Sequence, residues 1–191
     1  MAVLYPSARV VCNAILRRHT MTTEVQTRPL PTRAAATPAA AARALLEKHW
    51  NGRLPVDPAA IAIAEGIKVE RLGVFEDFPY SGEFLREQGV IRVNEWEAQV
   101  RQRFTLAHEL GHYALGHDDA PRDFAEAFSS KASAPIERAA NQFAAELLMP
   151  ASAVAKLVQT GIFKTVDDLA KAFNVSKVAM TYRINNLGLF V

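Results

Sequence analysis

Two histidines and a glutamate stand at a spacing that suits metal chemistry, in the segment His-Glu-Leu-Gly-His at residues 108–112. On an α-helix, residues four apart lie one turn above one another, so the rings of His108 and His112 can reach a single metal ion. Glu109 can contact a water molecule that such an ion activates. The apolar residues of segment 99–115 recur with helical spacing. We therefore predict a helix that carries a metal centre.

A catalytic zinc site needs a third protein ligand and keeps its fourth position open. Three candidates follow the motif. His117 lies five residues after His112, whereas the pattern with a third histidine places it six residues after. Glu137 and Asn141 share a helix face, so one can bind the metal while the other accepts the ring N–H of a ligand histidine. Glu146 lies on a face rotated away from Glu137. The spacing favours Glu137 with Asn141, a set of two histidines and one glutamate.

The elements that must position these residues are short helices and strands. Capping residues, prolines at first helical positions and closing glycines mark the helix ends. They predict helices over 38–50, 58–66, 99–115, 136–149, 151–160, 165–173 and 176–187.

Extended segments 67–72, 81–86 and 90–94 predict a small antiparallel or mixed sheet that ends in a hairpin at Gln88-Gly89. For 90–94 two interpretations remain open, a strand that binds substrate backbone and an ordinary buried strand. Residues 118–135 are polar and contain two prolines, which predicts a loop or lid.

Composition and charge bound the function classes. The 191 residues are 50% hydrophobic and 22% charged, which excludes a disordered, collagenous or disulfide-scaffold protein. The net charge is +2, but residues 1–43 hold six arginines and one acidic residue, leaving 16 basic and 19 acidic residues in the remainder. The basic excess therefore belongs to the leader and is no argument for a nucleic-acid partner. Residues 1–36 are expected to be a flexible basic leader and linker, and Met21 is an alternative start.

The expected compartment is the cytoplasm. The chain has one cysteine, which fits a reducing environment. Pro6 and Arg9 interrupt any signal-peptide core, and no run of 18 apolar residues predicts a membrane helix.

Two segments carry a resemblance to a known family. Residues 101–112 contain Arg-x-Arg-Phe-Thr-Leu-Ala-His-Glu-Leu-Gly-His, and residues 137–150 read Glu-Arg-Ala-Ala-Asn-Gln-Phe-Ala-Ala-Glu-Leu-Leu-Met-Pro. Both resemble the ImmA/IrrE family of metallopeptidases, and the similarity extends over about residues 45–189. Because the motifs lie on two separate helices in the same order, the resemblance is specific.

The resemblance implies an α+β, zincin-like metalloprotease domain. It assigns His108, His112 and Glu137 as Zn²⁺ ligands and Glu109 as general base. Members of this family are cytoplasmic bacterial proteases that inactivate a helix-turn-helix repressor by limited cleavage, so the expected substrate is such a repressor. A His/His/Glu site also accepts manganese or iron.

An enzyme of this kind needs a donor for the oxyanion that forms during hydrolysis. Tyr80, Tyr113 and His117 are the candidates, with no basis in the sequence for a choice. An alternative function is a non-catalytic protease-fold protein or DNA-associated regulator that binds a repressor partner.

The C-terminal helices predict a helix-turn-helix-like subdomain over 151–191, after a metallopeptidase domain over 37–150. Ala170 is small, Val175 is expected to be buried at the turn, and the second helix carries basic and amide side chains. Asp167 and Asp168 offset this charge, so we expect a scaffold or docking role without direct DNA binding.

Overall fold

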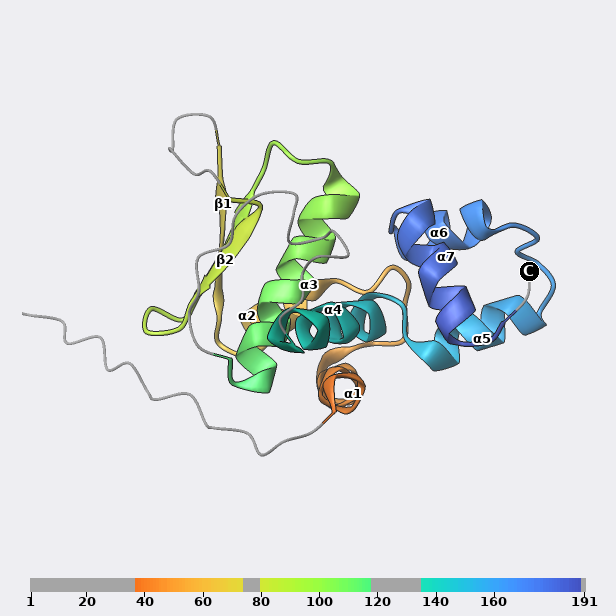
Figure 1. Ribbon diagram of the computed structural model, residues 1–191, viewed down its shortest axis with the longest axis horizontal. Helices are drawn as coiled ribbons and strands as arrows, with labels where there is room; N and C mark the ends of the chain where they lie inside the picture. The colour runs from red at the N-terminus through yellow and green to blue at the C-terminus, as the bar shows by residue number, and fades with distance from the viewer. Residues whose placement is uncertain (1–36, 74–79, 118–134, 190–191) are drawn as a thin grey trace, which may run out of the picture.

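The computed structural model describes residues 37–73, 80–117 and 135–189. The expected leader and nearly all of the expected loop at 118–135 lie outside these residues. The described chain has a mixed α+β fold (Figure 1). Its elements are α1 (Pro38–His49), α2 (Pro58–Ala64), β1 (Lys68–Leu72), β2 (Gly82–Leu85), β3 (Val90–Asn94), α3 (Gln99–Leu115), α4 (Pro135–Leu148), α5 (Ala151–Gln159), α6 (Val166–Phe173) and α7 (Lys177–Asn186).

The helix ends follow the local signals in the sequence. The side chain of Thr37 accepts a hydrogen bond from the Ala40 amide, and Asp57 caps α2 in the same way. Gly116 ends α3 with φ +73°, in the left-handed region that glycine adopts without strain. Helix α4 begins one residue earlier than expected, because a proline needs no N–H donor in the first turn.

The three-stranded sheet has the order β1-β3-β2, with β1 parallel and β2 antiparallel to β3. Arg92 in the central strand lies opposite Glu70 on one side and Glu83 on the other, and it donates to both carboxylates. Because β3 pairs along both edges, it has no edge to offer to a substrate. Of the two interpretations left open for 90–94, binding of substrate backbone is therefore wrong and the buried strand is correct. Within the described residues β2 is the edge strand that packs on α3.

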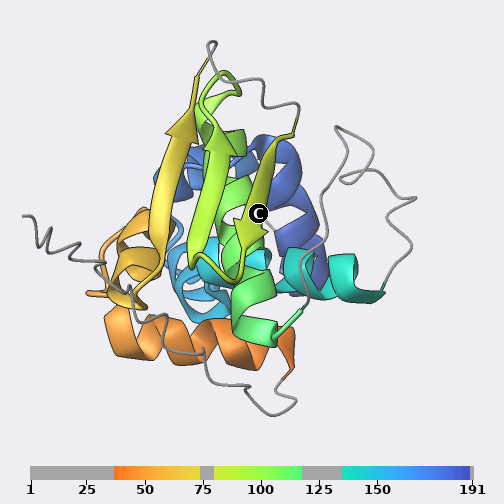
Figure 2. The same cartoon turned by 90° about the vertical axis from the view of Figure 1, so that its left-hand side faces the viewer.

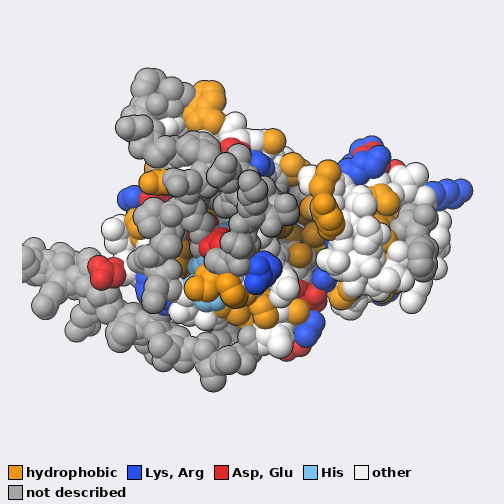
Figure 3. All heavy atoms as spheres, viewed as in Figure 1, with side chains coloured by type: hydrophobic (Ala, Val, Ile, Leu, Met, Phe, Trp, Pro, Cys, Tyr) orange, Lys and Arg blue, Asp and Glu red, His pale blue; other side chains and the backbone are white. Residues whose placement is uncertain are grey.

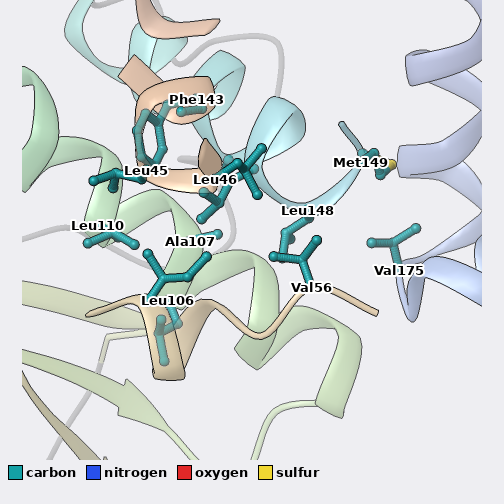
Figure 4. Packing of buried hydrophobic residues seen from close by; sticks show 14 of the residues in the cluster. Leu45, Leu46, Val56, Leu106, Ala107, Leu110, Phe143, Leu148, Met149 and Val175 are labelled. Carbon is teal, nitrogen blue, oxygen red and sulfur yellow. The ribbon is translucent and has the colours of Figure 1, made fainter. Parts of the chain in front are cut away.

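The helices cover one face of the sheet, as Figure 2 shows with the strands in front and the helices behind. Phe84, Ile91 and Val93 are buried on that face as part of the core. The core continues between the helices, where apolar residues of α1, α3 and α4 pack together (Figure 4). None of the described helices is both long and apolar enough to cross a membrane. The sheet and the buried helices together hold α3 in a fixed position.

The C-terminal helices pack against the end of α4. Arg183 of α7 donates through Nε to the Met149 carbonyl at 2.9 Å and forms an ion pair with the buried Glu146. Arg103 of α3 donates to the Asn174 carbonyl between α6 and α7 at 3.2 Å. Val175 is buried at this turn, as expected. A helix-turn-helix function for this pair, and a domain boundary at residue 150, stay predictions.

Candidate metal centre

Helix α3 presents both histidines of the motif to one point. His108 and His112 are 3% and 2% exposed, and their Nε2 atoms lie 3.2 Å apart. This proximity follows from the four-residue spacing, since side chains one turn apart lie on the same helix face. Two buried imidazole nitrogens directed at one point are a natural pair of ligands for a divalent metal.

Helix α4 brings a carboxylate to the same point. Oε2 of Glu137 lies 3.3 Å from His108 Nε2, and Oε1 lies 3.9 Å from His112 Nε2. The three residues each offer one ligand atom within 4.8 Å of the others. In a tetrahedral zinc site with bonds of about 2.1 Å, ligand atoms are roughly 3.4 Å apart. The three donors therefore fit such an ion, and with three protein ligands a fourth position stays available.

The approach of α4 to α3 depends on a glycine within the motif. A Cβ atom at Gly111 would lie 3.0 Å from Cδ1 of Phe143 and 3.3 Å from the backbone of Ala140. The backbones of α3 and α4 thus approach each other closely at Gly111 and Ala140, one turn from Glu137. Gly111 was assigned no role from the sequence, and only the packing of the two helices shows what it does.

Asn141 and Phe104 hold the ring of His108. Nδ1 of His108 donates to Oδ1 of Asn141 at 2.9 Å, and the Phe104 ring lies 6.5 Å from the His108 ring, centroid to centroid. An imidazole that donates from Nδ1 has its lone pair on Nε2, the atom that faces Glu137. The contact places Asn141 where the i, i+4 relation to Glu137 had suggested.

His117 contacts the other ligand histidine. The left-handed residue Gly116 turns the chain back, and Nδ1 of His117 lies 3.1 Å from Nδ1 of His112. Arg86, in the turn between β2 and β3, donates to the His117 carbonyl at 2.6 Å. His117 therefore contacts the Nδ1 side of the His112 ring, and the Nε2 atom of His112 faces the other ligands. The sequence analysis had named His117 as a possible third ligand or oxyanion donor and missed this position.

Glu109 lies on the side of α3 that packs against the edge strand β2. Glu109 is buried, with only 3% of its surface exposed. A Cβ atom at Gly82 of β2 would lie 3.5 Å from Cγ of Glu109 and 2.3 Å from Cγ2 of Thr105. Glycine at position 82 thus lets the edge strand approach α3 directly beside Glu109.

The remaining candidates lie in other surroundings. The Tyr113 hydroxyl donates to Oε2 of Glu65 at 3.3 Å, and its ring packs edge-on against Phe84. Burial by itself would raise the pKa of Glu65, but hydrogen bonds and charge from Lys48 and His49 lower it below its usual value. Tyr113 is thus part of a polar cluster at the end of α2.

Tyr80 and Glu146 complete the set of candidates. Tyr80 is half-buried just before β2, and a role for it stays a prediction. Glu146 pairs with Arg183 and lies 3.6 Å from Arg43, so it joins helices at the far end of α4 and does not join the ligand group.

Comparison with known proteins identifies the family of this chain. Over 109 residues, 54% of its length, the chain is 37% identical to the radiation response metalloprotease IrrE of Deinococcus radiodurans and 35% identical to the protein of the same name from Deinococcus deserti. The matches cover 33% and 38% of those relatives, so the chain spans little more than a third of their length. The family model described as the IrrE N-terminal-like domain matches residues 65–185. The chain therefore belongs to this peptidase family.

Proposed function

We propose that this chain is a zinc-dependent endopeptidase that makes a limited, site-specific cleavage in a protein substrate. The observation that carries the proposal is the convergence of His108, His112 and Glu137 beside the buried acid Glu109. Membership of a peptidase family supports the same reaction. Zinc is the metal that this donor set favours, because two imidazoles and one carboxylate are a known catalytic zinc set.

Glu109 is the residue that moves the proton. Zinc bound by the three ligands would act as a Lewis acid for the peptide carbonyl and lower the pKa of water to about 7. The Glu109 carboxylate then accepts the proton of the attacking water and donates it to the leaving amine nitrogen. Because Glu109 lies beside Gly82 at the start of β2, it would be next to a peptide that added to this edge strand.

The other residues around the site hold the histidines in the required tautomer. His108 donates from Nδ1 to Asn141, which leaves Nε2 as the ligand atom. For His112 the same arrangement requires that its Nδ1 donates to Nδ1 of His117. Both rings are thus oriented by a hydrogen bond from the atom opposite the ligand atom.

Strand β2 is the element that would bind the substrate backbone. It is an edge strand beside α3, and an extended peptide can add to such an edge through main-chain hydrogen bonds. Gly82 keeps that edge close to Glu109. Tyr80, two residues before Gly82, is our candidate for the oxyanion donor, since the hydroxyl of Tyr113 is directed to Glu65.

We propose a helix-turn-helix transcriptional repressor as the substrate and the cytoplasm as the place of the reaction. Both follow from the resemblance to the ImmA/IrrE metallopeptidases. The C-terminal helices contribute to docking of this substrate without binding DNA themselves. They are attached to the body through the ion pair of Arg183 and Glu146, which suits a fixed docking surface.

The test is cleavage of a purified helix-turn-helix repressor from the same organism. The two purified proteins are incubated with zinc, with zinc and a chelator, and with the Glu109→Gln variant loaded with zinc. We expect one discrete cleavage with zinc only, and a loss of at least about a hundredfold in the variant. A wild-type rate in Glu109→Gln would contradict its assignment as general base. Zinc binding without cleavage, together with a stable complex, would support the alternative of a non-catalytic repressor-binding protein.

A further inference from the structure

A groove of about 520 Å³ lies between the body and the C-terminal helices. Helices α3 and α4 form one wall and α7 forms the other. Its apolar lining includes Phe104, Ala145, Met149, Val175, Val178 and Tyr182. Figure 3 shows apolar side chains at the surface between the two groups of helices. A groove of this size is typical of a binding site for an apolar group.

The charged residues along the groove are already engaged. Arg101 donates to Glu97 at 2.8 Å, and Arg183 is paired with Glu146. The exposed lining residues are Ser176, Val178, Tyr182 and Asn186, and the two apolar ones, Val178 and Tyr182, lie one helical turn apart on α7. A concave apolar surface whose cations are paired selects for an apolar occupant over an anionic one.

The groove borders the metal centre on the Nδ1 side of His108, and none of the proposed ligands lines it. Two of its lining residues, Phe104 and Asn141, are the residues that contact the ring of His108. The Phe104 and His108 ring centroids are 6.5 Å apart. An extended peptide advances about 3.3–3.6 Å per residue, so roughly two to three residues of a chain whose carbonyl lies at the metal would span the His108 ring and reach the groove.

We propose that this groove selects the cleavage site by binding a large apolar side chain of the protein substrate, at a position within three residues of the cleaved bond. The inference rests on the proposed peptidase function and adds the determinant of its specificity. It gives α7 a definite role, because this helix supplies the apolar part of the rim through Val178 and Tyr182. The C-terminal helices would thus act in substrate selection as one wall of the binding site.

The test uses a tryptic digest of a bacterial proteome as the probe. The zinc-loaded Glu109→Gln chain is immobilised, and the retained peptides are identified by mass spectrometry; the wild-type chain is then given the same digest and its cleavage sites are mapped. We expect retained and cleaved peptides to share a leucine, isoleucine, phenylalanine or methionine at one fixed position near the cleaved bond. Added to the Glu109→Gln chain, Val178→Asp should lower this retention by about tenfold or more, and Val178→Ile should keep it.

Ile162→Asp, in the same background, is the matched control, since Ile162 is an exposed apolar residue outside the groove lining. Val178 is 65% exposed and Ile162 is 73% exposed, so either can be replaced without loss of core packing. Circular dichroism of each variant checks that it is folded. No retention, no apolar preference, or equal losses in the two aspartate variants would overturn the proposal. A chain that lacks residues 1–36 is tested in parallel. Retention by this shortened chain alone would also overturn the proposal, because residues 1–36 would then be the occupant of the groove. Apolar retention without cleavage would support the groove and refute the peptidase function.

Discussion

Replacing His117 by alanine should weaken zinc binding although His117 is not one of the proposed ligands. Its Nδ1 lies 3.1 Å from Nδ1 of His112, and the two rings pack with centroids 4.9 Å apart. Loss of such a partner of a ligand histidine costs about 10–100-fold in metal affinity. The acceptor here is a neutral ring nitrogen, and a neutral hydrogen bond contributes about 1 kcal/mol. We therefore expect the lower end, a loss of about tenfold or ~1.4 kcal/mol.

The assay is competition for zinc between the chain and a chelating indicator. Long-range ¹H–¹⁵N spectra of the zinc-loaded chain report in parallel which nitrogen of His112 carries the proton. His117→Asn should recover part of the affinity, because a carboxamide oxygen accepts a hydrogen bond as that of Asn141 does. The contact between Arg86 and the His117 carbonyl is unaffected by either variant, since it involves the backbone.

His49→Ala serves as the control, because His49 contacts Glu65 at 2.6 Å and lies outside the ligand group. It should leave zinc affinity unchanged. A zinc affinity of His117→Ala within twofold of the wild type, or a loss equal to that of the control, would refute the role of His117. A His112 ring protonated on Nε2 in the zinc-loaded protein would refute the assignment of its ligand atom.

Three further predictions concern stability. Gly82→Ala places a methyl group 2.3 Å from Cγ2 of Thr105, so we expect a loss of about 1–3 kcal/mol by chemical denaturation, partly recovered by Thr105→Ser; full stability in the single variant would contradict the close packing. Arg183→Ala leaves the buried Glu146 without its main partner and should cost ~3 kcal/mol, or roughly 6–12 °C in the thermal midpoint, whereas Arg183→Met with Glu146→Leu should recover most of it. The pKa of Glu65 is lowered from 4.5, so the folded state binds this proton less readily than the unfolded state, and the carboxylate adds stability above about pH 4.5 that is lost as the pH falls through the lower folded pKa. The difference in thermal midpoint between wild type and Glu65→Gln should thus shrink between pH 7 and pH 3, and a constant difference would refute it.

Much of the site was predictable because its signals are local. The i, i+4 spacing puts His108 and His112 on one helix face whatever the rest of the chain does. N-caps such as Thr37 and Asp57 start helices through hydrogen bonds within three residues. The same spacing relates Glu137 to Asn141. These relations depend only on helix geometry, so a correct helix prediction carries them.

The order of the strands was not predictable in this way. Segments 67–72, 81–86 and 90–94 each look extended, but nothing local says which one lies in the centre. The parallel pairing of β1 with β3 decides that β2 is the edge strand beside α3. For this reason the sequence left two interpretations of 90–94 open, and the structure excludes the one that binds substrate backbone.

The sequence by itself determined the helix that carries His108 and His112, the acid between them and the choice of Glu137 over Glu146. Only the tertiary structure decided that Gly111 lets α4 approach α3, and that α7 and α3 enclose an apolar groove next to His108. The physical reason is the range of the interactions. Hydrogen bonds and side-chain spacing within one helix turn are set by neighbouring residues, whereas contacts between distant segments form only when the apolar faces of several elements are buried together.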